Sequence, residues 1–166
     1  ETALRLGNGV IYVVDVTALS VQTLPLTSSV TIVPDWVFRD GFLWGVGDQT
    51  RTLYRVDATS GQVDSWSGAA QGLPAGRYGA AWAYDNGNVA FQSNDTGVAY
   101  QLSIPNPSAS PATPSPTMFQ VVSAVQGQGS YDNDGTSIPG SPIDLSVTKT
   151  APPTYAAGDT LAYDIV

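Results

Sequence analysis

The sequence predicts an all-β protein, organised as a partial β-propeller-like repeat of antiparallel sheets. First, β-branched or aromatic runs alternate with Asp, Asn and Gly, and no stretch keeps a helical period for more than about two turns. Second, the candidate strands recur roughly every ten residues, as in sandwiches, barrels and propellers. Third, the acidic residues are thirteen Asp and a single Glu, Glu1, and Asp favours turns whereas Glu favours helices.

The alternation of apolar and polar residues defines the candidate strands in chain order. They are Val10–Val16, Leu19–Leu24, Thr31–Val33, Trp36–Phe38, Phe42–Val46, Thr52–Asp57, Val63–Trp66, Gly79–Tyr84, Asn88–Gln92, Gly97–Ile104 and Thr117–Ser123. Turns containing Gly or Asn separate several of them, at 39–41, 59–61 and 85–88, where positive φ is needed between two strands. These turns predict antiparallel hairpins.

An internal repeat groups the strands into larger units. The unit at 40–63 has an echo at 81–104 and a fainter one at 9–16, a period of about 40 residues that is typical of propeller blades. Three blades cannot close a ring that takes about four to eight. We therefore expect further blades to precede Glu1 or to come from another chain. A sandwich whose hairpins merely look alike is the alternative.

Two composition shifts suggest how the chain is divided. Residues 105–116 are rich in Pro, which denies them a ladder of backbone donors, so we expect an exposed loop inserted in the domain. Residues 126–142 are rich in Gly, Ser, Asp and Asn and predict a linker. The expected division is a propeller-like domain at 1–125, the linker at 126–142, and a third region at 143–166 with strands at 143–150 and 160–166.

Composition excludes several function classes. The net charge is −8 and Lys149 is the only lysine, so no basic patch can neutralise a nucleic-acid backbone. Cysteine and histidine are absent, which removes thiol nucleophiles, Ser-His relays and the usual zinc ligands, and we expect no catalytic activity. No run of about 18 apolar residues predicts membrane insertion within this segment. If the protein is exported to an extracellular or cell-surface location, as the resemblance described below implies, its signal lies upstream of Glu1.

The third region resembles a known family of repeats. Ile143–Thr150 (Ile-Asp-Leu-Ser-Val-Thr-Lys-Thr) and Tyr155–Val166, which contains Gly-Asp-Thr-Leu-Ala-Tyr, are similar to the opening of the DUF11 bacterial Ig-like repeats. The resemblance implies that 143–166 supplies the first strands of an Ig-like β-sandwich repeat.

The preceding part resembles the propeller-like DUF6923 region. The similar segments are 53–61, 73–82, 133–136 and 139–145, and Ile138 stands where that family often has a Cys. The two resemblances together imply a large, exported, modular bacterial surface protein, common among actinobacteria and relatives, with no assigned catalytic activity.

One acidic turn is a candidate metal site, and no other cofactor is expected. Asp132, Asn133 and Asp134 place two carboxylates and an amide before Gly135, and oxygen ligands of this kind bind calcium. Because Asp and Asn are also common turn residues, an unoccupied acidic linker is the alternative.

Lys149 is a candidate for a covalent bond. Some Ig-like surface domains join strands by an isopeptide between Lys and Asn, and the Asn partner of Lys149 would lie beyond Val166. An ordinary surface lysine is the alternative.

We expect a structural or adhesive module whose partners are other copies of the chain or other chains or domains of the same protein. One alternative is a carbohydrate-binding module with a stacking surface of aromatic side chains, although their positions within strands favour core packing. These aromatics are Trp36, Trp44, Trp66, Trp82, Tyr54, Tyr78, Tyr84 and Tyr100. Another alternative is a polymer subunit, in which the strand at 160–166 adds to a neighbour's sheet through Thr160, Leu161, Tyr163 and Ile165.

Overall fold

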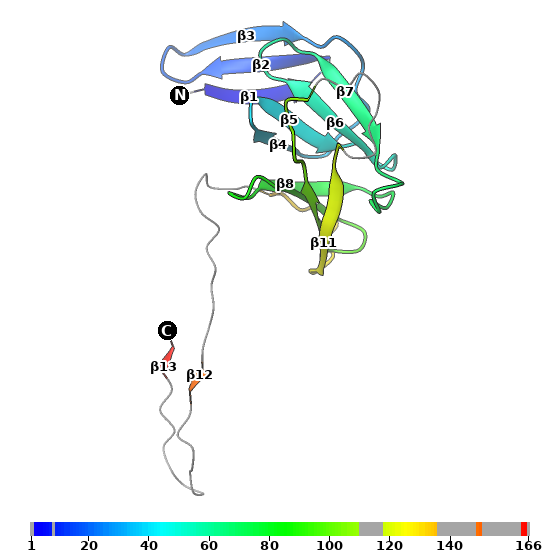
Figure 1. The fold of residues 1–166 in the computed structure, drawn as a ribbon. Helices are drawn as coiled ribbons and strands as arrows, with labels where there is room; N and C mark the ends of the chain where they lie inside the picture. The colour runs from blue at the N-terminus through cyan, green and yellow to red at the C-terminus, as the bar shows by residue number, and fades with distance from the viewer. Residues whose placement is uncertain (1, 8, 110–117, 136–148, 151–163, 166) are drawn as a thin grey trace, which may run out of the picture.

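A computed structural model describes residues 2–7, 9–109, 118–135, 149–150 and 164–165. This part of the chain contains strands and turns and no helix, so the all-β prediction is confirmed. No helix in it is therefore long and apolar enough to cross a membrane. Figure 1 shows three antiparallel sheets stacked one on another.

Eleven strands form the three stacked sheets. The first sheet has the order β1-β2-β3, the second β4-β5-β6-β7 and the third β11-β10-β9-β8. The bounds are β1 Thr2–Gly7, β2 Val10–Asp15, β3 Ser20–Pro25, β4 Trp36–Arg39, β5 Phe42–Val46, β6 Thr52–Asp57, β7 Val63–Ser67, β8 Tyr78–Ala83, β9 Val89–Ser93, β10 Val98–Ser103 and β11 Gln120–Gln126. A separate two-stranded ladder pairs β12 (Lys149–Thr150) with β13 (Asp164–Ile165).

The hairpin turns follow from short polar side chains and glycine. Asp40 and Gly41 both have positive φ, 52° and 85°, and Asp and Gly tolerate this conformation, so the two-residue turn joins β4 tightly to β5. After β6, the carboxylate of Asp57 accepts hydrogen bonds from the N–H groups of Thr59 and Ser60. These local contacts fix where each strand ends and how it pairs.

The second sheet is buried on both faces. Successive residues of a strand point to opposite faces, so β5 sends Leu43 toward the first sheet and Trp44 toward the third. The core shared with the first sheet contains Ile11, Leu43 and Val56, and the core shared with the third contains Trp44, Leu53 and Phe91, all of them buried. The three sheets are therefore one packed unit and not independent hairpins.

The innermost strands of the two four-stranded sheets lie next to each other. β4 contacts β8, while β7 and β11 stand at the opposite edges of their sheets. In the first sheet, β1 pairs with β2 as β5 pairs with β6, so β1 corresponds to β5. Among the described residues the first sheet therefore has no strand that corresponds to β4. This places the free edge of β1 on the same side as β4 and β8.

Two local predictions differ from the structure. Thr31–Val33 forms no strand: the Thr31 hydroxyl bonds Tyr54 Oη at 3.1 Å, and the Ile32 carbonyl accepts from Asp48 N, so the segment crosses the end of the second sheet. The strand expected at Thr117–Ser123 begins three residues later, at Gln120, because Met118 and Phe119 are buried in the core instead. Strand β1 was not predicted.

Trp44 provides a test of this stacked arrangement. It is 0% exposed, stacks on Trp66 with ring centroids 6.2 Å apart, and meets Phe42 edge-on at 6.1 Å. We expect Trp44→Ala to lower the free energy of unfolding by about 3–5 kcal/mol, because it empties the core between two sheets. The control, Val125→Ala on exposed β11, should change it by less than about 0.5 kcal/mol. Urea denaturation followed by circular dichroism measures both, and equal small effects would contradict the shared core.

Candidate functional site

Loops at one end of the second and third sheets surround a polar cleft of about 620 Å³. They are the β5–β6 loop, the residues before β8, the β9–β10 turn and the segment after β11. The lining residues are Asp48, Gln49, Arg77, Asn94, Asp95, Gly129, Ser130 and Tyr131. Binding residues are commonly carried on loops held by a rigid scaffold, which makes this cleft the leading candidate site.

Backbone hydrogen bonds hold these loops together. Gln49 N donates to Gly76 O at 3.0 Å, which joins the second sheet to the segment leading into the third. Asn94 N donates to Arg77 O at 2.8 Å, so two walls of the cleft are fixed to each other. The cleft is therefore largely preformed.

Asn94 connects the cleft to the inner edge of β8. Its side-chain oxygen accepts from Gly79 N at 2.8 Å, and its side-chain nitrogen donates to Tyr131 O at 3.0 Å. A Cβ on Gly79 would lie 2.4 Å from the side-chain oxygens of both Asn94 and Asn133, so only glycine fits there. Asn94 belongs to an Asn-Asp-Thr sequence, but it is buried and its amide nitrogen and oxygen each form a hydrogen bond within the protein, so it does not have the exposure that a glycosylation acceptor needs.

A carboxylate from the residue before β4 reaches the same inner edge. Asp35 Oδ2 accepts from Ala81 N at 2.6 Å and Oδ1 accepts from Trp36 N at 2.7 Å. Burial raises the pKa of Asp35, and the nearby negative charge of Asp134 also raises it, although the backbone hydrogen bonds act in the opposite direction. Asp35 thus joins β4 to β8 at the centre of the stack.

Three buried polar atoms near the cleft have no hydrogen-bond partner in the described part of the chain. They are Oδ1 of Asp48 and both amide atoms of Asn133. Such atoms are uncommon in native structures and often occur at sites completed by solvent or a ligand. The cleft is also lined by charged side chains of both signs, Arg77 and Asp95, and by Tyr131, which is 89% exposed.

The three predicted calcium ligands differ in their surroundings. Asn133 is half-buried beside Gly79, whereas Asp132 and Asp134 are exposed. Oδ1 of Asp134 accepts from Gly135 N at 2.9 Å, a bond typical of an Asp in a turn. Within the described ranges no three His, Cys, Asp or Glu side chains are grouped as metal ligands. Calcium binding stays a prediction, with the amide of Asn133 as its best-placed donor.

Of the remaining predicted residues, Lys149 and Ile165 belong to the described ladder of β12 and β13. Lys149 pairs with Ile165 through the backbone, and the structure describes neither side chain. Thr160, Leu161 and Tyr163 lie outside the described residues. The isopeptide and the assembly strand both stay predictions.

The aromatic side chains proposed as a sugar-stacking surface pack mainly inside the protein. Trp44, Trp66, Tyr54 and Tyr78 are buried, while Trp36, Trp82, Tyr84 and Tyr100 are half-buried. Core packing, the interpretation favoured for these strand positions, is confirmed for the four buried aromatics. The exposed tyrosine of the cleft, Tyr131, was not among the predicted residues, because it lies in a Gly-rich segment without strand character.

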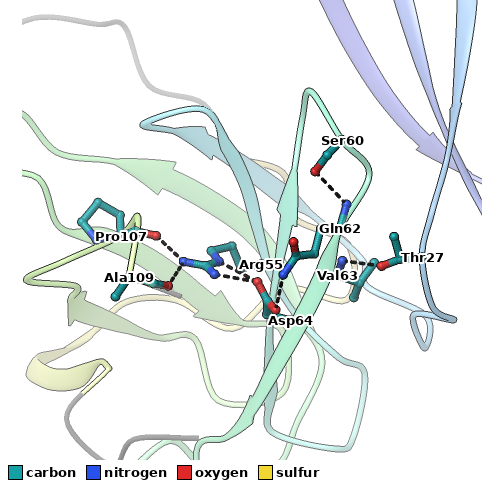
Figure 2. A network of polar contacts seen from close by, with 8 residues as sticks. All are labelled: Thr27, Arg55, Ser60, Gln62, Val63, Asp64, Pro107 and Ala109. Carbon is teal, nitrogen blue, oxygen red and sulfur yellow. Dashed lines mark hydrogen bonds and ion pairs between the residues drawn. The ribbon is translucent and has the colours of Figure 1, made fainter. Parts of the chain in front are cut away.

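A buried arginine forms a second polar cluster, which Figure 2 shows. Arg55 on β6 is 3% exposed, and its guanidinium lies 4.7 Å from the ring centre of Phe42 and 5.4 Å from that of Trp66. Its Nε and Nη2 both donate to Oδ2 of Asp64, and its Nη1 donates to the carbonyls of Pro107 and Ala109. The cluster is structural, because it ties the segment after β10 to the second sheet.

A scan against protein families matches residues 4–140, most of the chain, to the family described as a repeat of unknown function, DUF6923. A search of curated proteins finds no match.

The buried ion pair gives a matched pair of substitutions. Asp64→Asn removes the counter-charge of a buried guanidinium, and we expect it to lower the free energy of unfolding by about 3 kcal/mol. Asp40→Asn removes the partner of Arg39 in a more exposed pair and should cost at most about 1 kcal/mol. Chemical denaturation measures both, and equal costs would show that Asp64 does not hold Arg55.

Two carboxylates should shift stability with pH in opposite directions. The raised pKa of Asp35 means that its contribution is full below the ordinary value of 3.8 and is lost as pH rises through the folded-state pKa. Hydrogen bonds, above all from Ser60 N, lower the pKa of Asp57, so its contribution is present above 3.8 and is lost as pH falls.

Stability differences between wild type and each Asp→Asn variant, measured from about pH 3 to pH 6, test these signs. The difference for Asp35→Asn should fall with rising pH, and the difference for Asp57→Asn should rise. A difference for Asp35→Asn that rises with pH would contradict the raised pKa of Asp35, and a difference for Asp57→Asn that falls with pH would contradict the lowered pKa of Asp57. The slope is informative even if a substitution changes overall stability.

Proposed function

The chain belongs to the DUF6923 repeat family, and on that premise we propose that it is a non-catalytic structural or adhesive module of a secreted, modular bacterial surface protein. It works by surface contact, through the polar cleft at the loop end of the sheets. The DUF11-like sequence at 143–166 supports the modular arrangement, in which this domain is followed by Ig-like repeats.

One observation carries this proposal. Large aromatic residues such as Trp44, Trp66 and Phe91 pack between the sheets, whereas polar side chains from four loops line one cleft. A scaffold of this kind holds recognition loops in place and needs no moving part.

The composition supports a role without turnover. The chain has no His and no Cys, so the general bases and nucleophiles that these residues supply are not available to the cleft. Arg77 and Asp95, which line the cleft, are suited to polar recognition of a partner surface.

Carbohydrate binding is the second candidate, and the cleft is what favours it. Gln49 and Ser130 are polar groups of the kind that bond sugar hydroxyls, and the exposed ring of Tyr131 can stack on a sugar face. Because the strand tryptophans are packed inside, this version relies on Tyr131 and not on a surface of several tryptophans.

An adhesion measurement under flow tests the proposal. Beads coated with the chain should be retained on immobilised bacterial envelope material, and Arg77→Ala with Tyr131→Ala should lower retention at least about tenfold, because both residues line the cleft. The control is Asp40→Asn with Gln120→Ala, at the opposite end of the sheets, which should leave retention unchanged.

Soluble oligosaccharides separate the two candidates. If the module acts through protein surfaces, they leave retention unchanged, whereas competition at millimolar sugar, a typical affinity for weak sites, would identify a carbohydrate-binding module. Retention no greater than that of albumin-coated beads would contradict both.

A further inference from the structure

The three sheets are built from the same unit, but the first lacks one strand. β2 and β6 each end in an Asp whose carboxylate accepts from the N–H groups two and three residues later: Asp15 from Thr17 and Ala18, Asp57 from Thr59 and Ser60. β2 is therefore the counterpart of β6, β3 of β7, and β1 of β5. The strand without a counterpart in the first sheet is β4.

The edge where that strand belongs is open. β1 pairs with β2 alone among the described strands, in a register that sets Gly7 opposite Val10 across a two-residue loop. The residues that flank such a loop form a hydrogen-bonded pair, and the pattern alternates along the ladder. The backbone groups of Leu4 and Leu6 therefore point away from β2, toward the open edge.

An apolar groove of about 590 Å³ lies beside this edge. Leu4 and Leu6 of β1 form one side, Trp36 and Phe38 of β4 form the other, and the half-buried Asp35 also lines the groove. Phe38 is 54% exposed, whereas Val37, on the opposite face of β4, is buried in the core shared with the third sheet. β4 stacks on β8 by the Val37 face. On its other face, in the described part of the chain, Trp36 packs against the core shared with the first sheet, whereas Phe38 is left exposed.

We propose that the groove binds an extended strand of the β4 type, antiparallel to β1 and joined directly ahead of Thr2. In both four-stranded sheets the innermost strand comes directly before its neighbour in the chain and is joined to it by a short turn, as β4 is to β5. By analogy, the strand that pairs with β1 is the segment joined to the N-terminal end of β1. The strand packs on Trp36 and Phe38 through the side chain that corresponds to Val37, the face by which β4 stacks on β8, while its backbone pairs with Thr2 and Leu4. The inference concerns assembly of the fold and does not rest on the proposed function.

The test extends the chain with a copy of β4 and its turn. The six residues Trp-Val-Phe-Arg-Asp-Gly, taken from positions 36–41, replace Glu1 ahead of Thr2. The control extension has Pro in place of Val and Arg, which leaves the two aromatic residues but removes backbone donors from the strand. Both chains are compared with the unextended chain.

The first measurement is hydrogen exchange at single amides. Exchange at the Leu4 N–H group, which lies opposite the copied Val, should slow at least about tenfold in the β4 extension and stay unchanged in the proline control, whereas the Leu6 N–H group lies beyond the four-residue strand. The second is urea denaturation, where both the midpoint and the m-value should rise, because more surface is buried on folding. Exchange and denaturation equal to those of the control would overturn the proposal.

Light scattering distinguishes a competing occupant. If two copies of the chain pair through their β1 edges, the unextended chain is a dimer and the extension leaves it dimeric, which would overturn the proposal. If the added strand occupies the groove of its own chain, the extended chain is a monomer with a protected Leu4 amide. Leu6→Asp, which places a charge in the groove, should abolish the gain in stability from the extension.

Discussion

The structure depends on the need to cover both faces of every sheet. In the second sheet, alternation along β5 sends Leu43 into one core and Trp44 into the other, so a single strand contributes to two interfaces. Neither core exists without its neighbouring sheet, and burial of apolar surface is the main favourable term in folding. The stack is therefore stable only as a series, and each end of the series leaves a face or an edge that further polypeptide can cover.

The Arg55 cluster shows how a charge is accommodated within that constraint. Position 55 points into the same core as Leu53, where an unpaired guanidinium would be costly. Its partner Asp64 lies directly opposite on β7, so the sheet register itself brings the two charges together. The planar guanidinium has donors left for Pro107 and Ala109, and its face lies against aromatic rings. One side chain thus fixes the path of the chain after β10.

Local sequence predicted the strands and turns well and the site poorly. The Asp40-Gly41 turn is encoded by adjacent residues, and most strands follow from alternation of apolar residues. Thr31–Val33 has the composition of a strand, but its hydrogen bonds go to Asp48 and Tyr54 across the sheet end, a tertiary effect that no local pattern contains. The cleft was missed for the same reason, because its walls come from four separate loops. The Arg55–Asp64 pair, nine residues apart, could have been found from the hairpin register alone.

The inner edges of the first and third sheets, β1 and β8, differ in how their backbone amides are satisfied. On β8, side chains satisfy alternate amides of the edge: Asn94 accepts from Gly79 N, and Asp35 accepts from Ala81 N. Such contacts blunt an edge against strand addition. In the described part of the chain no side chain bonds the amides of Leu4 or Leu6 on β1, and an apolar groove lies beside them. Polypeptide can therefore add to the stack at β1, while the edge of β8 is reserved for the polar residues that lead to the cleft.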